Sequence, residues 1–185
     1  MTVDRRSMLK GAALGAFAFT VGGTQTWLTL REAYAQAVPL QVLTGAERAA
    51  LEALGDTLLP GAREAGIALY VDHQLSVDPG QCLLAARAAN VPPPVTNFYR
   101  ACLGALDRAA TAAHGQVFAA LKADEQVKFV DQMRQKVPEG WSGPPSPFFY
   151  LLARMDAVDV VYGTVEGFER LGVPYMPHVM PTRKW

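Results

Sequence analysis

The side chains in this chain that could carry out acid–base or metal chemistry are few and widely spaced. The three histidines, His73, His114 and His178, lie far apart in the sequence. Asp72 precedes His73, and a neighbouring carboxylate can orient an imidazole for catalysis or for metal binding. No third partner is evident in the sequence, so we interpret His73 as a surface or hydrogen-bonded helical histidine. His114, beside Gly115, is typical of a cation at a helix C-terminus.

Asp156 and Asp159 lie one helical turn apart and are the nearest approach to a paired carboxylate site. The same spacing is common on the solvent or partner face of a helix, and we favour that interpretation. No Gly-x-Gly-x-x-Gly, Gly-x-Ser-x-Gly or His-Glu-x-x-His pattern occurs, and neither does Cys-x-x-Cys. The sequence therefore predicts no cofactor, metal or catalytic site of its own.

Cys82 and Cys102 are the two cysteines, and each lies ten residues from Pro92. If the prolines at 92–94 turn the chain between two antiparallel helices, the cysteines face each other at similar heights. A disulfide there would contribute about 3 kcal/mol by the chain-entropy relation. Two buried free thiols acting as small apolar residues are the alternative, and the sequence leaves both open.

The elements that position these residues are predicted to be helices separated by proline and glycine. Thr44 and Glu47 form a capping box before a helix that ends at Pro60-Gly61. Further helices are predicted over 67–75, 81–89, 95–115, 124–137 and 146–162, and the chain from Gly163 onward is predicted to be irregular. Each of the last two predicted helices carries an apolar stripe along one face. The stripe of the fifth helix consists of Val127, Val130, Met133 and Val137, and that of the sixth consists of Phe148, Leu151, Leu152, Met155, Val158 and Tyr162. The fold class is all-α: one domain of five to six helices with an irregular C-terminal tail.

The N-terminal residues are typical of an export signal. Arg5, Arg6, Leu9 and Lys10 match the twin-arginine (Tat) pattern, although Asp4 and Met8 depart from it. The apolar run at 11–21 is shorter than the roughly 20 residues that span a bilayer. Small-x-small patterns predict cleavage after Ala35 or after Ala37, and we favour the first. Residues 1–35 are thus expected to be a leader, cleaved or loosely retained, and residues 36–185 a single domain in the periplasm.

Charge gives no indication of a nucleic-acid partner. The chain carries 17 basic and 17 acidic residues, and hydrophobic residues make up 50% of it. A balanced charge provides no electrostatic footprint for nucleic acid or for an anionic membrane. The hydrophobic content is enough to bury a core, so an intrinsically disordered chain is excluded.

Several segments in order resemble one family, the small (gamma) subunit of gluconate 2-dehydrogenase-type complexes, known as gluconate 2-dehydrogenase subunit 3. The matching stretches, besides the leader, are residues 51–60, 98–107, 118–121, 148–152 and 161–175. Many members carry a Gly-Gly-Asn element and a Trp before a final Gly-Pro stretch, whereas this chain reads EGFERLG at residues 166–172, which is typical of a divergent branch. The resemblance implies a non-catalytic subunit bound to a large FAD-dependent flavoprotein of the GMC type. It also implies a cytochrome c subunit as a third partner, and export of the cofactor-loaded complex by the Tat translocase.

A subunit of this kind needs apolar anchors that a monomer would not expose, and aromatic residues are enriched at interface centres. The candidate anchors are Trp141, Phe149, Tyr150, Tyr175, Met176, Met180 and Trp185. Packing onto this domain's own helices is the alternative for each. Two other functions stay open: a subunit that contributes His73 or Asp72 to catalysis, and a stand-alone binding protein for a small apolar ligand.

Overall fold

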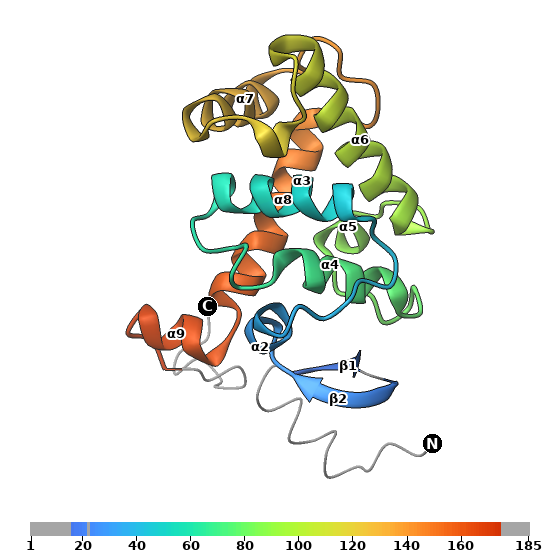
Figure 1. Ribbon diagram of the computed structural model, residues 1–185, viewed down its shortest axis with the longest axis vertical. Helices are drawn as coiled ribbons and strands as arrows, with labels where there is room; N and C mark the ends of the chain where they lie inside the picture. The colour runs from blue at the N-terminus through green and yellow to red at the C-terminus, as the bar shows by residue number, and fades with distance from the viewer. Residues whose placement is uncertain (1–15, 22, 175–185) are drawn as a thin grey trace, which may run out of the picture.

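The N-terminal end of the fold is a small hairpin followed by a short helix. The computed structural model describes residues 16–21 and 23–174. Strands β1 (Phe17–Val21) and β2 (Thr24–Leu28) pair antiparallel, with Phe17 opposite Leu28 and Val21 opposite Thr24. Helix α2 (Leu30–Ala35) follows directly and contacts α4. Figure 1 shows the hairpin and α2 at one end of the molecule.

The rest of the described chain is helical, which confirms the all-α class. The elements are α3 (Gly45–Leu58), α4 (Ile67–Ser76), α5 (Ala85–Ala88), α6 (Val95–His114), the 3₁₀ turn Phe118–Ala120, α7 (Ala123–Gln135), α8 (Ser146–Tyr162) and α9 (Val165–Arg170). Helix α3 crosses in front of α8 in Figure 1, and α6 and α7 lie toward the opposite end from the hairpin. Within the described residues, no helix is long and apolar enough to span a membrane.

Local signals set the main helix ends. Thr44 accepts a hydrogen bond from the Glu47 N–H at 3.3 Å, and the Glu47 carboxylate accepts one from the Thr44 N–H at 2.7 Å, so the predicted capping box is confirmed. Gly115 ends α6 in the left-handed conformation, φ +74°, which glycine adopts at no steric cost. Helix α8 begins at Ser146, which is buried, and has Pro145 at its N-cap position and Pro147 in its first turn.

The core lies between α3, α4, α6 and α8. Its largest fully buried side chains include Leu51 and Leu54 of α3, Tyr99 and Leu106 of α6, and Phe149 of α8. The rings of Tyr99 and Phe149 meet edge to face at 6.2 Å, a favourable geometry for aromatic pairs. The apolar stripe of α6 is buried from Val95 to Ala110, but Ala113, near the C-terminal end of the helix, is exposed.

Several predicted elements were wrong. The helix predicted over 81–89 is only the four residues of α5, and α9 forms where an irregular tail was predicted. Val127 of α7 and Val137, just after that helix, are exposed, while Phe129 joins Val130 and Met133 in the core. This shift of the buried face follows from Phe129, whose ring packs against Phe118 at 5.7 Å. The hairpin and α2 both lie within residues 1–35, the range predicted to be a leader.

Some predicted residues fall outside the described part of the chain. These are the twin-arginine residues Arg5, Arg6, Leu9 and Lys10, together with Tyr175, Met176, His178, Met180 and Trp185.

Candidate partner-binding surface

Asp72 and His73 do not form an orienting pair. The Asp72 carboxylate is buried and accepts hydrogen bonds from the backbone N–H groups of Gln41, Val42 and Leu43, at 2.8, 2.8 and 2.7 Å. Its role is to hold the segment that leads into α3. The His73 ring packs against Phe17 at 5.1 Å, and its buried Nδ1 has no hydrogen-bond partner among the described residues. Burial lowers the pKa of His73.

Asp156 is not on a solvent face, contrary to the prediction. It is 0% exposed and accepts hydrogen bonds from the Tyr99 hydroxyl and from the Ala85 N–H, the latter at 3.1 Å. Burial raises the pKa of Asp156 to about 6, although these two hydrogen bonds oppose the shift. Asp159 is exposed at the surface of α8, as predicted. The two carboxylates therefore face different surroundings and do not act as a catalytic pair.

The cysteines are two buried free thiols, the second of the alternatives that the sequence left open. Cys102 lies in the core face of α6, and burial raises the pKa of its thiol to about 12. Cys82 precedes the short helix α5 rather than lying within a long helix. Among the described residues no group of three or more His, Cys, Asp or Glu side chains is arranged to hold a metal ion.

The feature that stands out is α8, which is apolar on two opposite sides. One side faces the core and consists of Phe149, Leu152, Ala153, Asp156, Ala157, Val160 and Val161. The other side, which we call the outer face of α8, consists of Phe148, Leu151, Met155, Val158 and Tyr162. Those residues follow one another at intervals of three or four, so they form a single row along the helix. A helix that is apolar all round is normally buried on all sides.

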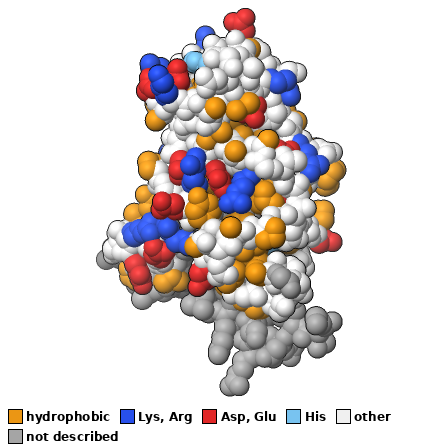
Figure 2. Space-filling view, viewed as in Figure 1, with side chains coloured by type: hydrophobic (Ala, Val, Ile, Leu, Met, Phe, Trp, Pro, Cys, Tyr) orange, Lys and Arg blue, Asp and Glu red, His pale blue; other side chains and the backbone are white. Residues whose placement is uncertain are grey.

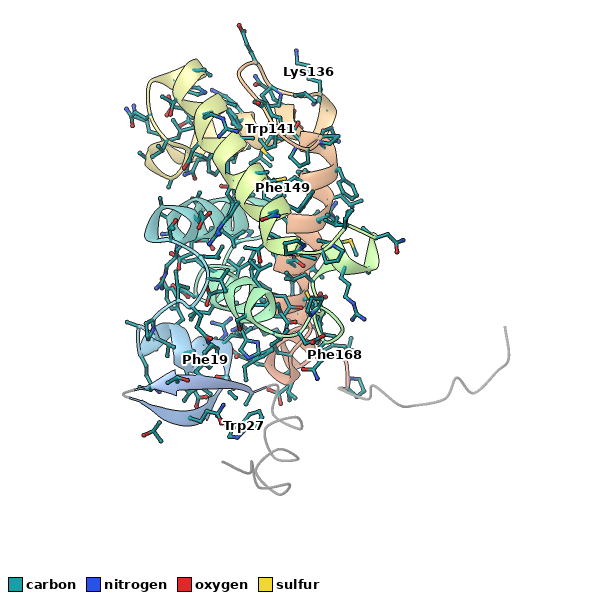
Figure 3. The ribbon with its side chains drawn as sticks, turned by 90° about the vertical axis from the view of Figure 1, so that its right-hand side faces the viewer. Phe19, Trp27, Lys136, Trp141, Phe149 and Phe168 are labelled. Carbon is teal, nitrogen blue, oxygen red and sulfur yellow. The ribbon has the colours of Figure 1, made fainter. Side chains whose placement is uncertain are left out.

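The outer face of α8 is nevertheless open in this chain. Leu151 is 50% exposed, Met155 45% and Val158 40%, while Phe148 and Tyr162 at the two ends are half-buried. Phe148 is held by an edge-to-face contact with Phe98 at 5.8 Å. Figure 3 shows α8 running lengthwise along one side of the molecule. The predicted main stripe of α8 is thus the exposed face, apart from Leu152, because both sides of the helix carry apolar residues.

Charged side chains border this row. Arg154 and Asp159 are exposed and, by the helical repeat, lie on opposite sides of the line from Leu151 to Val158. An apolar strip with a polar border is the usual anatomy of a protein interface. On the face seen in Figure 2, Lys, Arg, Asp and Glu side chains are scattered among hydrophobic ones.

The predicted anchors near the N-terminus of α8 have different positions. Phe149 is 0% exposed and packs against Phe98 and Tyr99, so it belongs to this domain's own core instead of an interface. Trp141 is half-buried, and its Nε1–H donates to the Pro144 carbonyl at 2.7 Å. Figure 3 labels both side chains on the α6–α8 side of the molecule. Tyr150 is half-buried on α8 and stays a candidate anchor.

A cavity of about 510 Å³ lies at the C-terminal end of α8. Its apolar walls include Phe17, Leu30, Leu83 and Val160, and its polar groups include Tyr70 and Asp159. Volume and lining fall within the range of small-molecule sites. Asp159 has its pKa raised by partial burial at this position.

Comparison with protein families decides what kind of protein carries this surface. Residues 45–181 match the family model described as gluconate 2-dehydrogenase subunit 3. The chain belongs to this family. The family description names one subunit of a dehydrogenase. The chain is therefore a small accessory subunit of a multi-subunit gluconate dehydrogenase complex. No curated protein and no solved structure matches the chain.

Sequence reasoning found the apolar row of α8 but did not predict that this row is exposed, and it named Phe149 of the opposite, buried side as a partner anchor. Apolar residues repeat at helical spacing at 148, 151, 155, 158 and 162, and also at 149, 152, 153, 157 and 160. This double repeat indicates a helix with apolar residues on two sides, whereas an ordinary surface helix has only one apolar side.

Proposed function

We propose that this protein is the non-catalytic small subunit of a periplasmic dehydrogenase complex and that it binds a large FAD-dependent catalytic subunit of the GMC type. In this proposal the small subunit stabilises the flavoprotein and carries it through the Tat translocase. The chain itself holds no cofactor, FAD belongs to the large subunit, and a cytochrome c subunit carrying haem is the third partner. The large subunit oxidises a sugar, an aldonate or a similar alcohol.

The outer face of α8 is the observation that carries this proposal. Leu151, Met155 and Val158 present three large apolar side chains in a row, each 40% or more exposed. Burying side chains of this kind stabilises an interface by about 25 cal/mol per Å² of apolar surface removed from water. Family membership supports the presence of a partner subunit, because the family is named as part of a multi-subunit enzyme. We therefore assign the outer face of α8 to the contact with the catalytic subunit.

The twin-arginine residues support the export role. A Tat leader on a chain without a recognisable cofactor motif is expected when the folded, cofactor-loaded cargo is a partner. The signal residues Arg5, Arg6, Leu9 and Lys10 would then serve both subunits.

The first test is a mild tagged purification from the periplasmic and membrane fractions, followed by an absorbance spectrum. We expect a flavin band and a co-purifying polypeptide much larger than this chain, and haem bands if the cytochrome subunit is bound. A colourless monomer would contradict the proposal.

A second test places the contact on α8. The double variant Leu151→Asp, Met155→Asp should lose the flavin band, because two buried carboxylates without partners oppose docking. The matched control is Val127→Asp, Val137→Asp, which changes two valines that are similarly exposed on and just after α7. The control should keep the flavin. Equal loss in both variants would mean that the outer face of α8 has no special role.

The cavity favours a second candidate function, that of a binding protein for a small ligand. Its volume of about 510 Å³ and its mainly apolar walls suit a small apolar molecule with a polar group placed near Tyr70 and Asp159. In that case the tagged protein would purify alone, and Leu83→Trp, which enlarges a side chain in the cavity wall, would weaken ligand binding. The subunit proposal expects the flavin band to survive Leu83→Trp.

A further inference from the structure

The segment predicted to be removed as a leader contributes to the core. Phe19, Leu28, Leu30, Ala33 and Val38 are all buried and belong to the same cluster as the helices of the main domain. Ala33 is fully buried in the middle of α2, which contacts α4. Removing residues 17–35 would therefore expose apolar side chains of α4 that are now covered.

The end of α2 is closed by a complete hydrogen-bonded turn. The Val38 N–H donates to the Ala33 carbonyl at 3.0 Å, and the Ala37 N–H donates to the Tyr34 carbonyl at 3.0 Å. Ala37 is left-handed, with φ +50°. This is the Schellman arrangement, and Val38 packs beside Ala33 as its usual hydrophobic contact. Both predicted cleavage bonds, after Ala35 and after Ala37, lie inside this turn.

The start of α2 is also fixed. Thr29 and Glu32 form a capping box, with the Glu32 N–H donating to the Thr29 hydroxyl at 3.2 Å and the Thr29 N–H donating to the Glu32 carboxylate at 2.8 Å. Arg31 reaches from α2 to Glu166 of α9, Nε to Oε2 at 3.2 Å. The helix is thus tied to the main domain as well as capped at both ends.

The main domain is shaped to receive this segment. Gly66 has φ +86°, and a Cβ placed there would lie 2.8 Å from the Leu30 carbonyl oxygen. Only glycine lets the backbone of α2 come so close. His73 of α4 packs against the rings of Phe17 and Phe19 at 5.1 and 5.7 Å. Features on both sides of the contact therefore depend on the presence of residues 17–38.

We infer that residues 17–38 are a permanent structural part of the folded protein and that the chain is not cut after Ala35 or Ala37. A protease acts on exposed, extended chain, whereas here the bonds lie in a closed turn and the small residue at Ala33 is covered. Any removal of the twin-arginine region must then occur before residue 17. This inference depends on the proposed export in one respect, because export determines which protease would meet the leader.

The test is the N-terminus and the intact mass of the protein purified from the periplasm. We expect residues 17–38 to be present. An N-terminus at Gln36 or at Val38 would overturn the inference.

A matched pair of variants tests the same inference through folding. Ala33→Glu and Ala35→Glu both spoil the Ala33-Tyr34-Ala35 pattern, but Ala33 is buried and Ala35 is exposed. In the full chain we expect Ala33→Glu to lower the Tm by roughly 10 °C, or to abolish soluble protein, while Ala35→Glu keeps the wild-type Tm. Equal Tm values for both variants would overturn the inference. If the protein is found only in the cytoplasm, the export proposal fails, yet this comparison still decides whether the segment belongs to the fold.

Discussion

Tyr99 of α6 donates a hydrogen bond from its hydroxyl to the Asp156 carboxylate of α8 inside the core. The same carboxylate accepts from the Ala85 N–H at the start of α5, so one buried aspartate joins three helices. Burial in such a place disfavours the charged carboxylate and raises the pKa of Asp156 to about 6. The free energy of unfolding should therefore depend on pH through this residue.

The first prediction concerns the sign of that dependence. The pKa of Asp156 is about 6 when folded and near 3.8 when unfolded, so the folded state binds more protons between these values. Its contribution to stability is fully present below pH ~4 and is lost as pH rises through about 6, by roughly 3 kcal/mol in total. Urea unfolding at several pH values, compared with Asp156→Asn, measures it. The difference between the two proteins should change over pH 4–6 and be flat above, and a pH-independent difference would contradict the shift.

The second prediction concerns the buried Asp72. Asp72→Ala leaves the N–H groups of Gln41, Val42 and Leu43 without their acceptor. Unpaired buried donors cost about 1–3 kcal/mol each when water cannot replace the partner, so we expect a loss of roughly 3 kcal/mol in the free energy of unfolding. Asp78→Ala is the control, because among the described residues the Asp78 carboxylate accepts only from the Gly80 N–H, in an exposed turn. A similar small loss in both variants would show that water replaces the carboxylate.

These two aspartates also show what the sequence could predict and what it could not. The capping box of Thr44 and Glu47 and the glycine end of α6 depend on neighbours three or four residues away, and both were predicted. The partner of Asp156 is Tyr99, which lies 57 residues away, so its burial depends on how α6 and α8 pack. The hairpin and α2 were missed for another reason. An apolar run such as 11–21 has the same composition in a leader and in a packed strand.

The third prediction separates backbone strain from the contact with α2. Gly66→Ala and Gly61→Ala both place alanine at a positive φ, +86° and +90°. At Gly61 no atom lies within 4 Å of the added Cβ, whereas at Gly66 the Leu30 carbonyl oxygen lies at 2.8 Å. Each should lose about 1–2 kcal/mol from strain, and Gly66→Ala should lose more because α2 is pushed away. Thermal unfolding of the full chain measures both. Equal losses would mean that α2 is not packed on Gly66.

The fourth prediction uses the two sides of α8. Phe149→Ala removes a fully buried ring and should lower the free energy of unfolding by about 3–5 kcal/mol. Leu151→Ala removes a half-exposed side chain two residues away and should change it by only ~0.5 kcal/mol. The order should reverse for assembly, since a central apolar anchor can carry 2 kcal/mol or more of binding free energy. Urea unfolding of the isolated chain and the flavin recovered per chain in a tagged purification give the two readouts.

The crossed pattern is what identifies a docking face, because a general loss of folding lowers both readouts together. Leu151→Ala with wild-type unfolding and at least tenfold less flavoprotein would place the catalytic subunit on the outer face of α8. Val127→Ala is the control, since Val127 is an apolar side chain that is 57% exposed on another helix, α7. Its unfolding and its flavin recovery should both match the wild type. Leu151→Ala with unchanged flavin recovery would instead leave the apolar row of α8 without a partner and would move the search for the interface to Trp141 and Tyr150.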